Sequence, residues 1–234
     1  MLMHGEGESG LDLKSYQAQT LVEVAYKALK KDITERVLVP GEKIILREVN
    51  ERYGISATPI KQALNRLIAE GLVESTPRKG VRVRVIKWEE IAELIDIRMM
   101  VETYYITQVI QNFIDDSSIK EKFLKNLQEQ MGIIEHVSDL DDYFKYYNLD
   151  FEFHQLYIKC CKNKRVLQIY NSLGIHAYAF YVYGKQEIGG LKAGLQEHEN
   201  IYNALAKKDE NELRKLIEIH IANAKNKVYL MIKK

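Results

Sequence analysis

Residues 39–85 read VPGEKIILREVNERYGISATPIKQALNRLIAEGLVESTPRKGVRVRV, and this stretch decides the fold of the N-terminal part of the chain. Pro40-Gly41 predicts a turn, and Leu46–Tyr53 has the composition of a short helix. Gly54 can adopt the left-handed conformation that closes a helix at its C-terminus. We therefore expect a short helix, a turn and a second helix, in the order of a helix-turn-helix.

The second helix is expected to begin near Ser56 and to end at Gly71. Ser56 or Thr58 can cap it, and Pro59 suits its first turn, where a missing backbone donor costs nothing. Apolar residues then recur with helical spacing, at Ala63, Leu64, Leu67 and Ile68. The other face presents polar and cationic side chains that suit phosphates and base edges in a major groove, namely Lys61, Gln62, Asn65 and Arg66.

Beyond Gly71 the pattern changes to alternation, which predicts a strand with valines on one face and arginines on the other: Val81, Arg82, Val83, Arg84 and Val85. Pro77 to Gly80 form a turn at its tip, so Arg78 and Lys79 would meet a sugar-phosphate backbone. A solvated surface hairpin is the alternative. The position of this hairpin behind a recognition-type helix favours a DNA-binding wing.

The charges are divided unevenly between the two parts of the chain. Residues 14–87 contain 15 Lys and Arg against 8 Asp and Glu, a net charge of +7. Residues 88–234 contain 19 against 22, a net charge of −3. This asymmetry is typical of a nucleic-acid-binding module joined to a domain that does not bind nucleic acid.

The motifs PG, GIS, TPIKQAL, EGLV and P-R-x-G, in this order, resemble the N-terminal domain of GntR-type bacterial transcription regulators over residues 15–86. The resemblance implies DNA contact at the matching positions, which are Arg47, Thr58, Lys61 and Gly80. Ala57 and Lys61 stand where that family usually has arginine. Without the bidentate guanidinium fork guanine readout is weakened, so the family's usual operator core is not assumed here.

A chain of 234 residues with 46% apolar content favours two globular domains. We expect a mainly α protein, with residues 1–13 as a disordered leader or a cloning remnant, 14–87 as a winged helix-turn-helix domain and 88–234 as an all-helical domain. The apolar runs are too short and too charged to cross a membrane. Cys160 and Cys161 are adjacent, so they cannot pair ordinarily, and two cysteines indicate a reducing cytoplasm.

From Trp88 onward the sequence has no proline and shows repeated helical periods, which predicts an all-helical bundle. The expected helices are Glu89–Phe113, Ser118–Val137, Leu140–Cys161, Lys164–Tyr183, Leu191–Lys207 and Glu210–Ile232. Asp209 and Glu212 have the spacing of a capping box, which fixes the hairpin between the last two helices.

Two histidines flank that hairpin. His198 lies eleven residues before Asp209 and His220 eleven after it, so antiparallel helices would place both about 16 Å from the turn. Asp150 and His154 are four residues apart, hence on one helix face. One carboxylate and three imidazoles in a bundle core can bind a divalent transition metal such as zinc or nickel. On spacing alone, histidines that only form hydrogen bonds remain the alternative.

The Asp-x3-His motif with two later histidines, together with an Arg-x3-Glu motif in the first bundle helix, resembles the FCD effector domain of the FadR subfamily of GntR regulators. This resemblance covers residues 89–220. It implies a metal site formed by Asp150, His154, His198 and His220, with a small carboxylate metabolite bound beside it.

Arg98 is a candidate for binding that carboxylate, because its planar fork holds two oxygens at once. An ordinary ion pair with Glu102, four residues later, is the alternative. Asn171 and His176 are further candidates for the effector cavity.

Together these features predict a homodimeric regulator that binds a palindromic double-stranded DNA operator and changes its DNA affinity when a small acid binds. No membrane partner is expected. One rival is a metal-dependent hydrolase at the Asp/His site, but no general base is evident, since Glu197 and Glu199 should point to other helix faces. The other rival is a metal-free regulator in which the histidines hydrogen-bond the acid directly.

Overall fold

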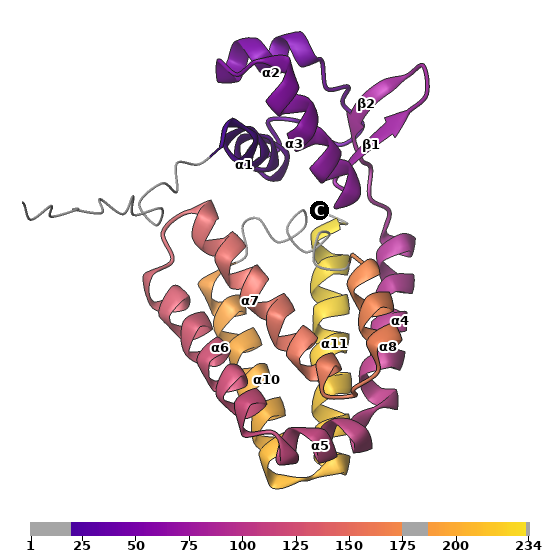
Figure 1. Cartoon of the computed structure of the whole chain (residues 1–234), viewed down its shortest axis with the longest axis vertical. Helices are drawn as coiled ribbons and strands as arrows, with labels where there is room; N and C mark the ends of the chain where they lie inside the picture. Colours follow the sequence, from indigo (N-terminus) through magenta and orange to yellow (C-terminus); the bar gives the residue numbers. More distant parts are fainter. Residues whose placement is uncertain (1–19, 175–186, 233–234) are drawn as a thin grey trace, which may run out of the picture.

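The computed structural model describes residues 20–174 and 187–232. Figure 1 shows a small head of α1, α2, α3 and a β-hairpin above a larger bundle that begins with α4. The described residues form ten helices and one two-stranded antiparallel sheet, which confirms the predicted mainly α fold with a small wing. The expected leader lies outside the described residues.

Three helices build the head: α1 (Leu21–Thr34), α2 (Leu46–Tyr53) and α3 (Ala57–Ala69). The Thr20 side chain caps α1 by accepting a hydrogen bond of 3.2 Å from the amide of Glu23. Gly54 closes α2 with a φ of +65°, as its position predicted. Ser56 is the N-cap residue of α3, so the turn between the two helices is short and the predicted helix-turn-helix is present.

Helix α3 packs against α1 through its apolar face. Ala63 and Leu67 are inaccessible to solvent and join Leu29 and Ile33 of α1 in the core. Complete burial of a leucine or isoleucine side chain stabilises the fold by about 1.5–3 kcal/mol. Because this face is fixed inward, the polar strip of α3 faces outward.

The wing is a hairpin of β1 (Val73–Thr76) and β2 (Gly80–Val83), in which Val73 pairs with Val83 and Thr76 with Gly80. The segment after the Pro40-Gly41 turn lies along β2, since the amide of Ile44 donates to the carbonyl of Val81. The alternation predicted to continue to Val85 stops at Val83. Val83 is buried whereas Val85 is half exposed, because the chain leaves the hairpin here.

Seven helices form the described part of the bundle: α4 (Trp88–Tyr104), α5 (Ile106–Asp115), α6 (Ser117–His136), α7 (Leu140–Lys159), α8 (Lys164–Ser172), α10 (Ile188–Lys207) and α11 (Glu210–Ile232). Side chains cap several of them: Asp116, Asp139 and Asn163 accept hydrogen bonds from the first turns of α6, α7 and α8. Asp209 does the same for α11, which agrees with the predicted hairpin.

Two predicted helices differ from the structure. The helix expected over residues 89–113 is broken at Tyr105, where the chain turns so that α4 packs against α11 and α5 runs beneath the bundle. The turn buries Ile106 and Phe113 completely. The helix expected over residues 164–183 ends at Ser172, followed by Gly174 with a φ of +61°, and its last part lies outside the described residues.

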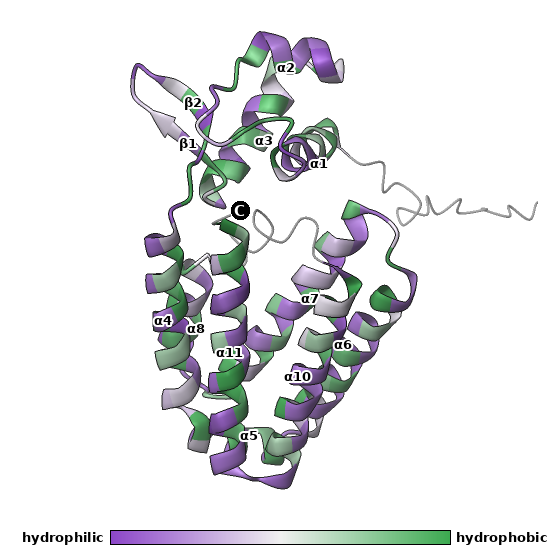
Figure 2. Ribbon diagram, turned by 180° about the vertical axis from the view of Figure 1, so that it is seen from behind, coloured by the Kyte–Doolittle hydropathy of each residue, from purple (hydrophilic) through white to green (hydrophobic). Residues whose placement is uncertain are grey.

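Only residues 84–87 separate β2 from α4. The amide of Arg84 donates to the carbonyl of Leu72 at 3.0 Å, and its guanidinium lies 2.7 Å from Glu90 on α4. Arg84 therefore ties the hairpin to the bundle. Figure 2 shows hydrophilic and hydrophobic residues mixed along the helices of both parts. No described helix has the length and apolar character needed to cross a bilayer.

Candidate metal centre and DNA interface

Three of the four predicted metal ligands meet in the bundle core. His154 from α7, His198 from α10 and His220 from α11 are all buried. Nε2 of His154 lies 3.3 Å from Nε2 of His198 and 3.1 Å from Nε2 of His220. The α10–α11 hairpin brings His198 and His220 together, with ring centroids 4.9 Å apart, as the spacing about Asp209 predicted.

Each histidine is oriented by an oxygen atom on its outer side. Nδ1 of His154 lies 3.2 Å from Oε2 of Glu102, and Nδ1 of His220 lies 2.7 Å from Oε2 of Glu197. Nδ1 of His198 lies 3.0 Å from Oε1 of Gln130. These oxygens can only accept, so each Nδ1–H donates outward and each Nε2 lone pair points to the shared centre.

Asp150, the fourth predicted ligand, lies one turn before His154 on α7. Its Oδ1 is 3.5 Å from Nε2 of His198, and the side chain is 22% exposed. The carboxylate thus lies beside the histidine cluster and is more exposed than the three imidazoles.

The donors fit a divalent transition metal. Zinc–imidazole bonds of about 2.0–2.1 Å place two nitrogen ligands roughly 3.0–3.4 Å apart, and the His154–His220 and His154–His198 separations of 3.1 and 3.3 Å agree. Burial, followed by the nearby positive charge of Arg98, lowers the pKa of His154, which keeps its imidazole neutral and able to bind a metal.

Arg98 of α4 reaches the same centre and is also buried. Its Nε donates to Oε1 of Glu102 at 2.6 Å, so the ordinary ion pair considered above is present. Its Nη2 lies 2.6 Å from Nε2 of His154 and 3.3 Å from Nε2 of His220. Burial opposes ionisation of Glu102, but Arg98 and His154 outweigh it and hold the pKa of this carboxyl well below its usual range.

The sequence-based site omitted several outer partners. Glu197, expected to point elsewhere, contacts His220 and accepts a second hydrogen bond from Asn223. Tyr170 donates to Glu102 at 2.8 Å. Gln130 follows from no motif. The only available signal was the position of Glu197 beside His198 on the predicted hairpin.

Of the two other predicted effector residues, Asn171 lies away from this cluster. Asn171 is exposed on α8, accepts a hydrogen bond from Gln155, and lines a cavity of about 690 Å³ at the junction of head and bundle. His176 lies outside the described residues.

Most predicted DNA contacts lie on the exposed surface of the head. On α3, Thr58, Lys61, Gln62 and Asn65 are exposed. Exposed residues elsewhere are Arg47 of α2 and, at the wing tip, Arg78, Lys79 and Gly80.

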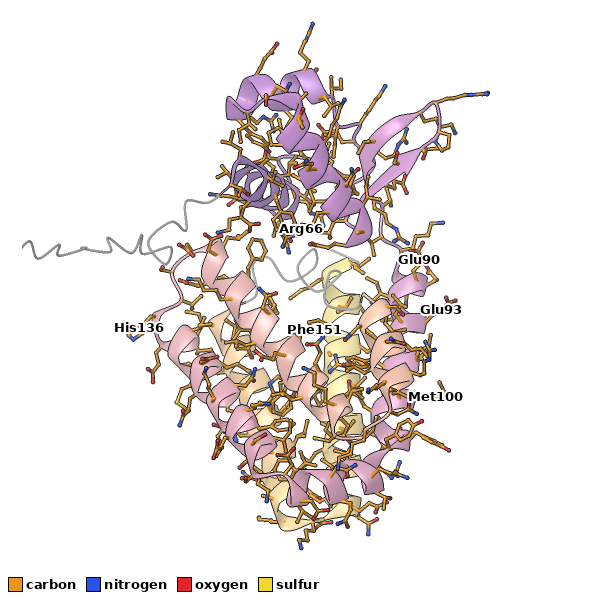
Figure 3. The ribbon with its side chains drawn as sticks, viewed as in Figure 1. Arg66, Glu90, Glu93, Met100, His136 and Phe151 are labelled. Atoms are coloured by element: carbon orange, nitrogen blue, oxygen red, sulfur yellow. The ribbon has the colours of Figure 1, made fainter. Side chains whose placement is uncertain are left out.

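Arg66 is also exposed, but it has partners within the protein. Its guanidinium lies 2.9 Å from Glu23, pairs with Glu70, and stacks 3.6 Å from the ring centroid of Tyr26. Figure 3 shows Arg66 at the side of the head that faces the bundle. It also lines the junction cavity, together with α7 residues such as Phe144.

Comparison with known proteins agrees with this architecture. The profile described as "Bacterial regulatory proteins, gntR family" matches residues 21–83, and the FCD domain profile matches residues 93–223. The HTH-type transcriptional repressor RspR of Escherichia coli K12 is 24% identical over 196 residues, which cover 84% of this chain and 83% of RspR. The Uxu operon regulator of Haemophilus influenzae is 24% identical over 217 residues, or 86% and 79% of the two chains. A solved structure of E. coli McbR/YncC has a TM-score of 0.64 at 18% identity, covering 90% of this chain and 98% of its own.

A winged helix-turn-helix joined to a helical effector domain defines a DNA-binding transcription regulator. This chain belongs to the GntR family, and its bundle is an FCD domain. It is a metabolite-responsive transcriptional regulator, and the hydrolase interpretation is set aside because the family and its curated relatives are regulators rather than enzymes.

Proposed function

We propose that this regulator binds zinc or nickel through His154, His198 and His220, with Asp150 as a fourth ligand, and senses a small carboxylate there. The observation that carries the proposal is the convergence of three buried Nε2 atoms whose Nδ1 atoms are all engaged outside the centre. A bound metal would supply open coordination positions for carboxylate oxygens.

Arg98 supports the carboxylate part of the proposal. Its Nη2 contacts Nε2 of His154 and of His220, and these are the same two atoms that are proposed to bind the metal. A cation bound there would take those lone pairs and leave Nη2 to bind an acid beside the metal. Asn171 lies at the junction cavity, so we place it outside this effector site. His176 stays a prediction.

A metal-free effector site is the second candidate. The contacts of Arg98 with His154 and His220 favour it, because the guanidinium can hold a carboxylate directly, and an imidazole that gains a proton on Nε2 can donate to the same acid. The two candidates differ in whether acid binding requires a metal.

The exposed strip of Lys61, Gln62 and Asn65 supports an α3 that enters the major groove of DNA. Arg78 and Lys79 at the wing tip suit the adjacent backbone. We propose a palindromic operator in the bacterial cytoplasm, read by two heads of one dimer.

The outer face of α4 supports the dimer. Ile97, Met100 and Tyr104 recur at helical spacing and are exposed, while the opposite face of α4 is buried in the bundle. Figure 3 shows Met100 pointing away from the bundle. A helix that is apolar on both faces is expected to contact a second partner, and a second copy fits a palindromic operator.

Elemental analysis of the purified protein, before and after reloading with zinc or nickel, tests the metal. Calorimetry with dicarboxylates and hydroxy acids, on loaded and chelator-treated protein, tests the sensor, and operator binding with and without each acid tests the coupling. Stoichiometric metal and acid binding that requires it are expected. Absence of metal after reloading would reject the metal site, and acid binding without metal would favour the second candidate.

A further inference from the structure

Two buried amides on α6, Asn126 and Gln130, stand behind the metal centre one helical turn apart. Nε2 of Gln130 donates to Oδ1 of Asn126 at 2.7 Å, and Nδ2 of Asn126 donates to the carbonyl of Leu149 at 3.0 Å. Oε1 of Gln130 lies 3.0 Å from Nδ1 of His198. One hydrogen-bonded chain therefore runs from the α7 backbone to a candidate metal ligand.

This chain has only one consistent direction. The Leu149 carbonyl can only accept, so Asn126 must turn its NH2 group toward it and its oxygen toward Gln130. Gln130 must then turn its own NH2 group toward Asn126 and its oxygen toward His198. That oxygen requires a proton on Nδ1 of His198, which leaves Nε2 as an acceptor at the centre.

We propose that Asn126 and Gln130 are positioning residues that hold His198 in the Nδ1–H tautomer, the one able to bind a metal through Nε2. This inference rests on the proposed metal function. The other two histidines are oriented by Glu102 and Glu197, whose carboxylates accept in any rotation. An amide can rotate to present either a donor or an acceptor, so only at His198 does the tautomer depend on an anchor further away.

The anchor explains why a residue without any contact to His198 should matter. If Asn126 no longer fixes the Gln130 amide, that amide can turn its NH2 group toward Nδ1 and place the proton on Nε2. A protonated Nε2 cannot bind a metal. Asn126→Leu is therefore expected to weaken metal binding although every candidate ligand and its nearest partner are retained.

The relay is the hydrogen-bonded chain from the Leu149 carbonyl through Asn126 and Gln130 to His198. Two variants and a control test it on the full-length protein. Asn126→Leu removes the anchor, Gln130→Met removes the acceptor, and Gln128→Met changes an exposed glutamine of the same helix. Long-range ¹H–¹⁵N spectra report the tautomer of His198 in chelator-treated protein, and chelator competition reports zinc and nickel affinity. We expect Nδ1–H in the wild type and in Gln128→Met, mixed tautomers in the other two, and about 10–100-fold weaker metal binding in both.

A wild-type His198 protonated on Nε2 would overturn the proposal without any variant, as would an unchanged tautomer in both Asn126→Leu and Gln130→Met. If the wild type binds no metal, the proposed metal function fails, while the tautomer spectra still decide whether the relay exists. Thermal unfolding followed by circular dichroism identifies any variant that does not fold. In that case the tautomer of His198 in the wild-type spectrum decides whether the proposal holds.

Discussion

Oε2 of Glu197 lies 2.7 Å from Nδ1 of His220, so a hydrogen bond joins the two arms of the α10–α11 hairpin at the candidate metal centre. Glu197→Ala removes the acceptor that orients this imidazole. We expect metal affinity to fall about 10–100-fold, because outer partners of this kind fix the orientation and basicity of a histidine ligand. Chelator competition measures the change. Glu199→Ala, two residues along α10, is the control, and equal affinities in both variants would contradict the assignment.

Lys61 and Arg66 both belong to the predicted DNA-contacting strip but differ in their surroundings. Lys61→Ala should weaken operator binding and lower the slope of log affinity against log salt by about 1, because one phosphate contact is lost. Arg66→Ala should leave that slope unchanged and lower the melting temperature, since Arg66 pairs with Glu23 and Glu70. Salt titrations and thermal melts measure both. A reduced slope in Arg66→Ala would return this arginine to the DNA interface.

Arg98→Lys keeps a positive charge beside Glu102 but replaces the planar fork with a single ammonium group. We expect carboxylate affinity to fall about 10–100-fold, the loss of one charge-assisted hydrogen bond. Calorimetry with the acid that binds best to the wild type measures this loss. Metal affinity, measured in parallel, should change by much less. A variant that loses metal and acid binding equally would indicate that Arg98 supports the histidines rather than the acid.

Met100→Glu places a charge on the exposed apolar face of α4. In a symmetric dimer this charge enters the interface twice, so we expect the dimer dissociation constant to rise about a hundredfold or more. Sedimentation equilibrium measures it. Leu124→Glu, on an exposed position of α6, is the matched control. If both variants stay dimeric, the dimer uses another surface.

The local parts of the fold were predictable because short-range signals determine them. Gly54 ends α2 at the expected residue, since its left-handed conformation disfavours other residues. The meeting of His198 and His220 followed from helix geometry and one capped turn.

Features set by distant partners were not predictable. The break at Tyr105 depends on how α4 and α5 pack, and no local breaker residue marks it. The contacts of Arg66 with Glu23 and Tyr26 could not be predicted, because these partners lie about 40 residues away in the sequence. The contact of Glu197 also depends on a partner that is distant in the sequence. Helical rotation points Glu197 away from His198, yet its side chain reaches His220 on the neighbouring helix.

The connection between head and bundle has a mechanical consequence. Four residues separate β2 from α4, and Arg84 is bonded on both sides of that join. If α4 forms the proposed dimer contact, a tilt of α4 there would rotate α3 about this pivot. The half-sites of an operator repeat at about 34 Å along DNA, so a small angle at the pivot is enough to move one recognition helix out of step with its groove.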